Sequence, residues 1–258
     1  MKIKSGRYND TLIMAGRCLL LSKRNPDTFF ASILLPAVMM ILFVSLFGGL
    51  ISVENMSYVN YIVPGILIQC IAQGSSVTAI MMNKDITGGM ASRYSTLPIK
   101  KICVLHGHIA EAVVRSVLTS AVVLIIALFL GFRPSLDYTG TAVFVLILFC
   151  AVLMLSWLAV VLGLAAGSAE GASALAALAV ILPYLSSGFV PTDALPDIMK
   201  IFAEYQPMTP IIDTMRSALL GKPLDIKVSA AAFIWCIALS IILYFISAVL
   251  FRQRLRHQ

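Results

Sequence analysis

Residues 141–164 read TAVFVLILFCAVLMLSWLAVVLGL, a stretch without one charged side chain. A helix needs about 20 mainly apolar residues to cross the hydrocarbon core of a bilayer, so this stretch predicts a membrane-spanning helix. Five further stretches meet the same requirement, and none alternates with period two as the strands of a membrane β-barrel do. The predicted spans are Phe29–Leu50, Val59–Met82, Ile109–Leu130, Thr141–Leu164, Ala174–Val190 and Val228–Phe251. The fifth is the weakest, because Pro183 interrupts it.

The composition agrees with a membrane protein and excludes an ordinary soluble enzyme. Of 258 residues, 60% are hydrophobic and only 12% are charged, against about 25% charged residues in a typical soluble domain. No linker divides the chain, so we expect one all-α polytopic membrane domain over residues 1–258. The five cysteines are scattered without a CxxC pair, which indicates neither a disulfide framework nor a metal site.

The distribution of Lys and Arg predicts the orientation of the chain. Thirteen lie before the first span, between spans 2 and 3, or after span 6, whereas five lie on the opposite side and Arg115 lies inside span 3. Positively charged loops stay in the cytoplasm. We therefore expect a multi-pass protein of the cell membrane with both termini cytoplasmic, and we attribute the net charge of +7 to this rule rather than to a nucleic-acid partner.

The segment before the first span, residues 1–28, is expected to carry a helix on the cytoplasmic membrane surface. Asn9 or Asp10 can cap this helix, and Pro26 ends it because the residue before a proline avoids the α conformation. Its apolar face and the basic residues Arg17 and Arg24 suit anionic lipid headgroups.

Residues 83–108 form the longest predicted cytoplasmic connection. It contains charged residues, the pair Gly88-Gly89 and Pro98, which favour short helical pieces over a slack linker. Two interpretations stay open: a docking surface for a soluble partner, or a basic tether that binds nothing.

Residues 191–227 are predicted to lie on the opposite side of the membrane. Six of the eleven prolines fall between Pro183 and Pro223, so this backbone cannot form one spanning helix. Its two apolar pieces, 198–202 and 211–216, are too short to cross. We expect a re-entrant hairpin of short helices packed against the protein.

The motifs of self-contained catalysis are missing. The only Gly-Lys pair, Gly221-Lys222, is followed by Pro223 and is no phosphate loop. HExxH and GxSxG are also absent, and His106 and His108 in a basic loop are weak evidence for a metal. We expect no enzyme activity and no cofactor on this chain.

Polar residues inside the predicted spans are candidates for function, because they are costly in lipid. Glu111 and Arg115 stand four residues apart and can form an ion pair. In span 2, small or polar residues share one helix face: Gly65, Gln69, Gln73, Ser76 and Asn83. This stripe lines a translocation path or packs against another helix, and the sequence does not decide between them.

The pattern as a whole resembles a known family. The stretch from Ser187 (SGFVPTDALPD) through Phe202 (FAEYQPMTP) to Arg216 and Gly221, with six spans and a basic first helix, is similar to the ABC-2-type permeases. The closest resemblance is to their daunorubicin/multidrug-resistance branch. Phe189-Val190 and Gln206-Pro207 depart from the pairs found in polysaccharide exporters, which favours drug-like or lipid-like cargo.

The resemblance implies roles for particular residues. It implies a homodimer of permease chains in which each chain recruits a separate ABC ATP-binding subunit that carries ATP and Mg²⁺. It implies a coupling helix within 85–101, an extracellular gate at Pro191–Gly221, and a path and dimer interface along spans 2 and 5. The candidate residues are Asp85, Arg93, Lys100 and Lys101 for coupling, Gln69, Gln73, Ser76 and Ser187 for the path, and Phe189, Phe202, Met215 and Arg216 for the gate.

The function that the sequence favours is the permease subunit of an ATP-driven exporter of amphipathic compounds. A permease for polysaccharides or lipid-linked glycans is the first alternative, and a membrane scaffold without transport is the second. A secondary carrier is disfavoured, because no acidic residue lies near the middle of a predicted span.

Overall fold

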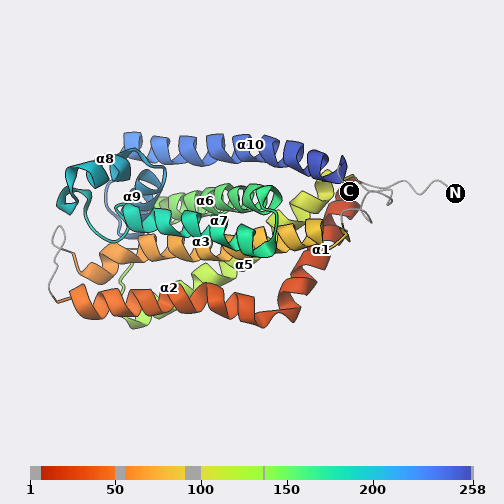
Figure 1. The fold of residues 1–258 in the computed structure, drawn as a ribbon. Coiled ribbons are helices and arrows are strands. Elements are labelled where there is room, and N and C mark those ends of the chain that lie inside the picture. The colour runs from red at the N-terminus through yellow and green to blue at the C-terminus, as the bar shows by residue number, and fades with distance from the viewer. Residues whose placement is uncertain (1–6, 50–55, 91–99, 136, 257–258) are drawn as a thin grey trace.

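The computed structural model describes residues 7–49, 56–90, 100–135 and 137–256, and they fold into a bundle of helices (Figure 1). Five helices are long and apolar enough to cross a membrane. They are α2 (Pro26–Phe47), α3 (Tyr58–Thr87), α5 (Ile102–Phe129), α6 (Tyr138–Ala165) and α10 (Ile226–Arg256). The predicted fifth span corresponds to a shorter apolar segment, which consists of α7 (Ala169–Ile181) and the 3₁₀ helix η1 (Leu182–Leu185). The prediction of an all-α polytopic protein is confirmed.

The bundle has two different ends (Figure 1). At one, which we call the terminal end, α1 (Arg7–Arg24) begins and α10 finishes. At the other, the hairpin end, lie η2 (Thr192–Ala194), α8 (Asp197–Tyr205) and α9 (Met208–Leu219). The first and last helices therefore meet the same end of the bundle, as an even number of crossings requires.

Helix α3 occupies the centre of the bundle. It packs against α2, α5, α6, α7 and α9. In the most apolar 18 residues of each helix, 72% of the residues are buried in α3, against 22% in α2 and 11% in α10. The outer helices expose many large apolar side chains, such as Leu34 on α2 and Ile241 on α10. An apolar surface this extensive would be unfavourable in water, and it fits contact with lipid.

Several helix ends differ from the predicted spans. Helix α3 continues to Thr87 and α5 already begins at Ile102, so both ends of the predicted 83–108 connection are helical. Helix α7 begins five residues before the predicted Ala174, because Ser168 caps it by accepting a hydrogen bond from the Gly171 amide at 3.1 Å. Such a side-chain cap satisfies an amide that the first turn leaves unpaired.

The end of α6 is capped by two distant side chains. Asn83 on α3 donates to the carbonyls of Gly163 and Ala166 at 3.0 and 2.9 Å. Arg254 on α10 donates to Leu164 at 2.9 Å. The last carbonyls of a helix have no partner within the helix, so these bonds fix α3, α6 and α10 together at the terminal end.

Candidate functional site

A partly buried network of polar and charged side chains joins three helices at the terminal end. The Arg17 guanidinium on α1 donates to both carboxylate oxygens of Asp85 on α3, at 2.7 and 2.8 Å. His108 on α5 contributes Nε2 at 3.1 Å from the same carboxylate. We call these three residues the terminal-end network. A bidentate guanidinium–carboxylate pair is among the stronger and more directional hydrogen-bonded contacts in proteins.

The sequence places α1 close enough to form this network. Gly107 lies under α1, and a Cβ atom there would come within 2.9 Å of the Met14 backbone. The absence of a side chain at this position allows the two helix backbones to approach. Helix α1 therefore lies directly on the start of α5, with Met14 and Cys18 buried between them.

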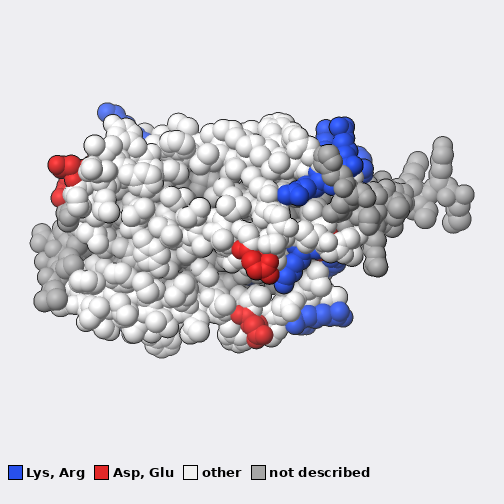
Figure 2. Space-filling view, in the orientation of Figure 1, with Lys and Arg blue, Asp and Glu red and all other residues white. Residues whose placement is uncertain are grey.

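The four coupling candidates have different environments. Asp85 is buried within the terminal-end network, whereas Lys100 and Lys101 are exposed just before α5. Arg93 lies outside the described residues. Lys and Arg side chains gather at this end of the molecule on the face that Figure 2 shows.

The stripe on α3 packs against neighbouring segments of the chain at three of its five positions. A Cβ atom on Gly65 would meet the Gly188 carbonyl oxygen, so the two backbones are in direct contact. The buried Gln69 donates to the hydroxyl of Tyr184 in η1, and Asn83 caps α6. Gln73 and Ser76 are half-buried, and the Ser76 hydroxyl donates to the Gln73 carbonyl in its own helix at 2.7 Å.

After η1 the chain turns sharply, and side chains from elsewhere bind the carbonyls of this turn. Gln206 donates to the carbonyl of Leu185. Tyr61 and Arg216 both donate to the carbonyl of Ser187, at 2.7 and 2.6 Å. Buried backbone carbonyls outside a helix need hydrogen-bond partners from elsewhere in the protein or from water. These donors meet that need.

Arg216 is the centre of a second buried network, at the hairpin end. Its Nε donates to the Tyr61 carbonyl at 3.2 Å, and Nη1 donates to the Asp213 carboxylate. Its guanidinium also lies 4.0 Å from the centroid of the Tyr61 ring, an additional cation–π contact. Ser187 completes this hairpin-end network by donating its hydroxyl to Asp213 at 2.7 Å. The residues are Tyr61, Ser187, Asp213 and Arg216.

The predicted gate residues do not share one environment. Phe189 is buried and stacks on Tyr184, with ring centroids 4.6 Å apart. Met215 on α9 is fully buried. Phe202 on α8 is 47% exposed, so in this chain it makes little packing contact.

Helix α8 is the exposed part of the hairpin. Ile198 and Tyr205 are exposed, and Lys200 donates to Asp193 at 2.6 Å. This hydrogen bond and the lysine charge hold the pKa of Asp193 below its ordinary value. The pair is at the surface and contributes little to stability.

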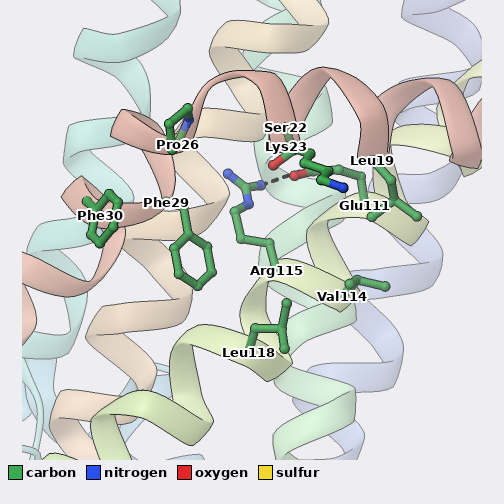
Figure 3. A pocket seen from close by; sticks show the side chains of 10 residues that line it. All are labelled: Leu19, Ser22, Lys23, Pro26, Phe29, Phe30, Glu111, Val114, Arg115 and Leu118. Atoms are coloured by element: carbon green, nitrogen blue, oxygen red, sulfur yellow. Dashed lines mark hydrogen bonds and ion pairs between the residues drawn. The ribbon is translucent and has the colours of Figure 1, made fainter.

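Glu111 and Arg115 form an ion pair in the wall of a pocket between α1, α2 and α5 (Figure 3). Arg115 Nη2 lies 3.1 Å from Glu111 Oε2 and 2.5 Å from the Thr78 hydroxyl on α3. Both charged side chains are almost completely buried. The cavity has a volume of about 500 Å³.

Sequence reasoning did not find Tyr61 or Tyr184 and gave Arg17 a different role. Arg17 was assigned to a basic face toward lipid headgroups, but it is bonded to Asp85, 68 residues away. Tyr61 and Tyr184 lie within mainly apolar stretches of the sequence, 58–72 and 174–185. A buried tyrosine usually finds a hydrogen-bond partner for its hydroxyl. A tyrosine inside an apolar span therefore indicates that such a contact exists, but it does not indicate which residue is the partner.

Comparison with known proteins gives a family match over most of the chain. The model of the ABC-2 type transporter family matches residues 9–220. The daunorubicin resistance ABC transporter permease protein DrrB1 of Streptomyces coeruleorubidus is 27% identical over 213 residues, which cover 82% of this chain and 75% of that protein. The Probable doxorubicin resistance ABC transporter permease protein DrrC of Mycobacterium tuberculosis is 28% identical over 225 residues, covering 83% and 78%.

Proposed function

The chain belongs to the ABC-2 type transporter family, and from this membership we propose that it is the membrane half of an ATP-driven exporter of amphipathic, drug-like or lipid-like compounds. The observation that carries the proposal is the similarity over about four-fifths of the chain to permeases named for daunorubicin and doxorubicin resistance.

The energy for export comes from a separate ATP-binding subunit, to which ATP and Mg²⁺ bind. This subunit docks at the terminal end, where Lys100 and Lys101 are exposed and where the predicted coupling segment containing Arg93 begins and ends. Asp85 has an indirect part: its carboxylate is bonded to Arg17, so it transmits movement between α1 and α3 rather than touching the partner.

The terminal end faces the cytoplasm in this proposal. The gathering of Lys and Arg at that end (Figure 2) supports this orientation, because basic residues are retained on the cytoplasmic side. The hairpin of α8 and α9 is then extracellular, and α1 lies along the inner membrane surface.

Two copies of the chain form the transporter, with the path between them. Helix α7 is the better candidate for the interface, because it exposes the small residues Ser173, Ala174 and Ala177 and small residues let helices approach closely in lipid. Helix α3 is largely enclosed by its own chain. Gln73, Ser76 and Ser187 line the path near α7, and Phe189 and Met215 support the gate above it.

Transport into inside-out membrane vesicles tests the proposal. Vesicles from cells that contain this chain and its ATP-binding subunit should accumulate daunorubicin on addition of ATP. The fluorescence of the drug measures this accumulation. Replacing the phosphate-loop lysine of the partner is the matched control and should abolish accumulation. Uptake of a lipid-linked glycan without uptake of daunorubicin would favour the polysaccharide exporter. A lack of any ATP-dependent uptake would favour the scaffold.

A further inference from the structure

The pocket between α1, α2 and α5 contains polar groups that the protein itself leaves unpaired. Among the described residues, Glu111 Oε1 and Arg115 Nε and Nη1 are buried without a hydrogen-bond partner. Both residues line the cavity, and their side chains are 0% and 2% exposed. A buried unpaired polar group costs about 1–3 kcal/mol, and more when it is charged, so such groups call for a partner.

The remaining walls are mostly apolar and open toward the side of the bundle. Phe29, Val114 and Leu118 line the pocket (Figure 3), and Val114 and Leu118 are 42% and 52% exposed on the outer face of α5. Ser22 and Lys23 at the end of α1 form a polar rim. A polar inner corner with an apolar opening toward lipid matches a molecule with a headgroup and acyl chains.

The charges in the corner select the kind of headgroup. Two guanidinium nitrogens, Nε and Nη1 of Arg115, need an acceptor, which an anion supplies best, and one carboxylate oxygen of Glu111 beside them needs a donor. Phosphatidylethanolamine carries both on one headgroup, a phosphate and a primary ammonium. Phosphatidylglycerol has the phosphate but offers Glu111 only neutral hydroxyl donors, and phosphatidylcholine has a cation without N–H donors.

We propose that this pocket is a binding site for phosphatidylethanolamine, with the phosphate on Arg115 and the ammonium on Glu111. The cavity volume of about 500 Å³ lies within the range of small-molecule sites. The hydrogen bond between Arg115 and Thr78 on α3 closes the inner wall of the pocket. The lipid therefore stays between α1, α2 and α5. It joins α1, which carries Arg17 of the terminal-end network, to α2 and α5.

Lipid titration of the purified full-length protein, read by native mass spectrometry, tests the site. The wild type should bind dioleoylphosphatidylethanolamine about tenfold more tightly than dioleoylphosphatidylglycerol, the ratio expected for about 1.4 kcal/mol from an ammonium in place of a hydroxyl donor to Glu111. Glu111→Gln should remove this preference, because it should weaken the binding of the ethanolamine lipid and leave the binding of the glycerol lipid unchanged.

Two further variants keep the proposal falsifiable if Glu111→Gln does not fold. Leu118→Trp fills the opening without touching the ion pair and should weaken the binding of both lipids. Arg252→Gln, which removes an exposed charge at the same end, is the matched control and should bind like the wild type.

Equal affinity of the wild type for the two lipids would overturn the proposal, and so would unchanged binding to Leu118→Trp. Displacement of the bound lipid by daunorubicin would reassign the pocket to cargo and would also overturn it. Failure of the transport assay above has no bearing on these binding measurements, so the two proposals can fail separately.

Discussion

The two polar networks at opposite ends of the bundle each contain an arginine, but the two arginines bind different groups. At the hairpin end Arg216 donates to the backbone carbonyls of Tyr61 and Ser187 as well as to a carboxylate. At the terminal end Arg17 binds the side chain of Asp85. The first network therefore stabilises a broken stretch of backbone, and the second joins α1, α3 and α5 through side chains alone.

This difference indicates which end can move. Separating Arg216 from the turn would remove a donor from the Ser187 and Tyr61 carbonyls, and a buried carbonyl that loses its partner is costly. Separating Arg17 from Asp85 exposes two side chains near the bundle end, where water can solvate them. We therefore expect the terminal end to transmit movement and the turn after η1 to stay fixed. Any opening at the hairpin end then involves the exposed helix α8.

The largest effect is expected from Arg216→Ala. It leaves the Ser187 and Tyr61 carbonyls short of a donor and Asp213 without its cation, at a cost of about 3 kcal/mol. The free energy of unfolding in mixed micelles, followed by tryptophan fluorescence, measures this. Arg216→Lys should lose less stability, because the lysine ammonium can still donate to one of the three groups that the Arg216 nitrogens bind. A stable Arg216→Ala variant would mean that the turn does not need the network.

Gly65→Ala should cost about 2 kcal/mol, because the new methyl group would overlap the Gly188 carbonyl and force the turn away from α3. The control is Gly16→Ala on α1, where no atom lies within 4 Å of the added group. That change should be neutral or stabilise α1 by up to about 1 kcal/mol. Equal destabilisation by both substitutions would contradict the close contact at the hairpin end.

Asp85→Asn should cost about 1.5 kcal/mol, since the Arg17 side chain is partly exposed and water replaces some of the lost bonds. Amide hydrogen exchange should become faster in α1 but not in α9. ATP turnover should continue while export falls, because α1 is no longer held to α3. Normal export by this variant would exclude the proposed role of the network in coupling.

Phe202→Ala should have the smallest effect on stability, below about 1 kcal/mol, because nearly half of the side chain is exposed. The effect of this substitution on export measures how much α8 contributes to the gate. An effect on stability as large as that of Arg216→Ala would show that α8 is packed more tightly than its exposure indicates.

The sequence predicts the crossings better than the contacts between them. Composition locates the spans, because a long helix that is apolar on all sides is stable mainly in contact with lipid. The prolines correctly indicate the short helices α8 and α9. The end of α7 could be anticipated from Pro183. The start of α7 at Ala169 depends on the Ser168 cap, a signal that the apolar pattern obscures.

The networks could not be predicted because their members are far apart in the chain. Arg17 and Asp85 are 68 positions apart, and Arg216 and Tyr61 are 155 apart. No periodicity connects residues at such separations. Glu111 and Arg115 were found because they lie on neighbouring turns of one helix, but their pocket depends on where α1 and α2 meet.

Cross-linking to the ATP-binding subunit tests the central claim most directly. Single cysteines are introduced as Lys101→Cys at the terminal end and Lys200→Cys at the hairpin end, in a chain whose five native cysteines have been replaced. A short reagent that carries a maleimide at one end and a photoreactive benzophenone at the other should join the subunit to position 101 in intact complexes and not to position 200. Cross-linking at 200 alone would reverse the orientation, and the absence of any adduct at 101 would contradict docking of an ATP-binding subunit at this end.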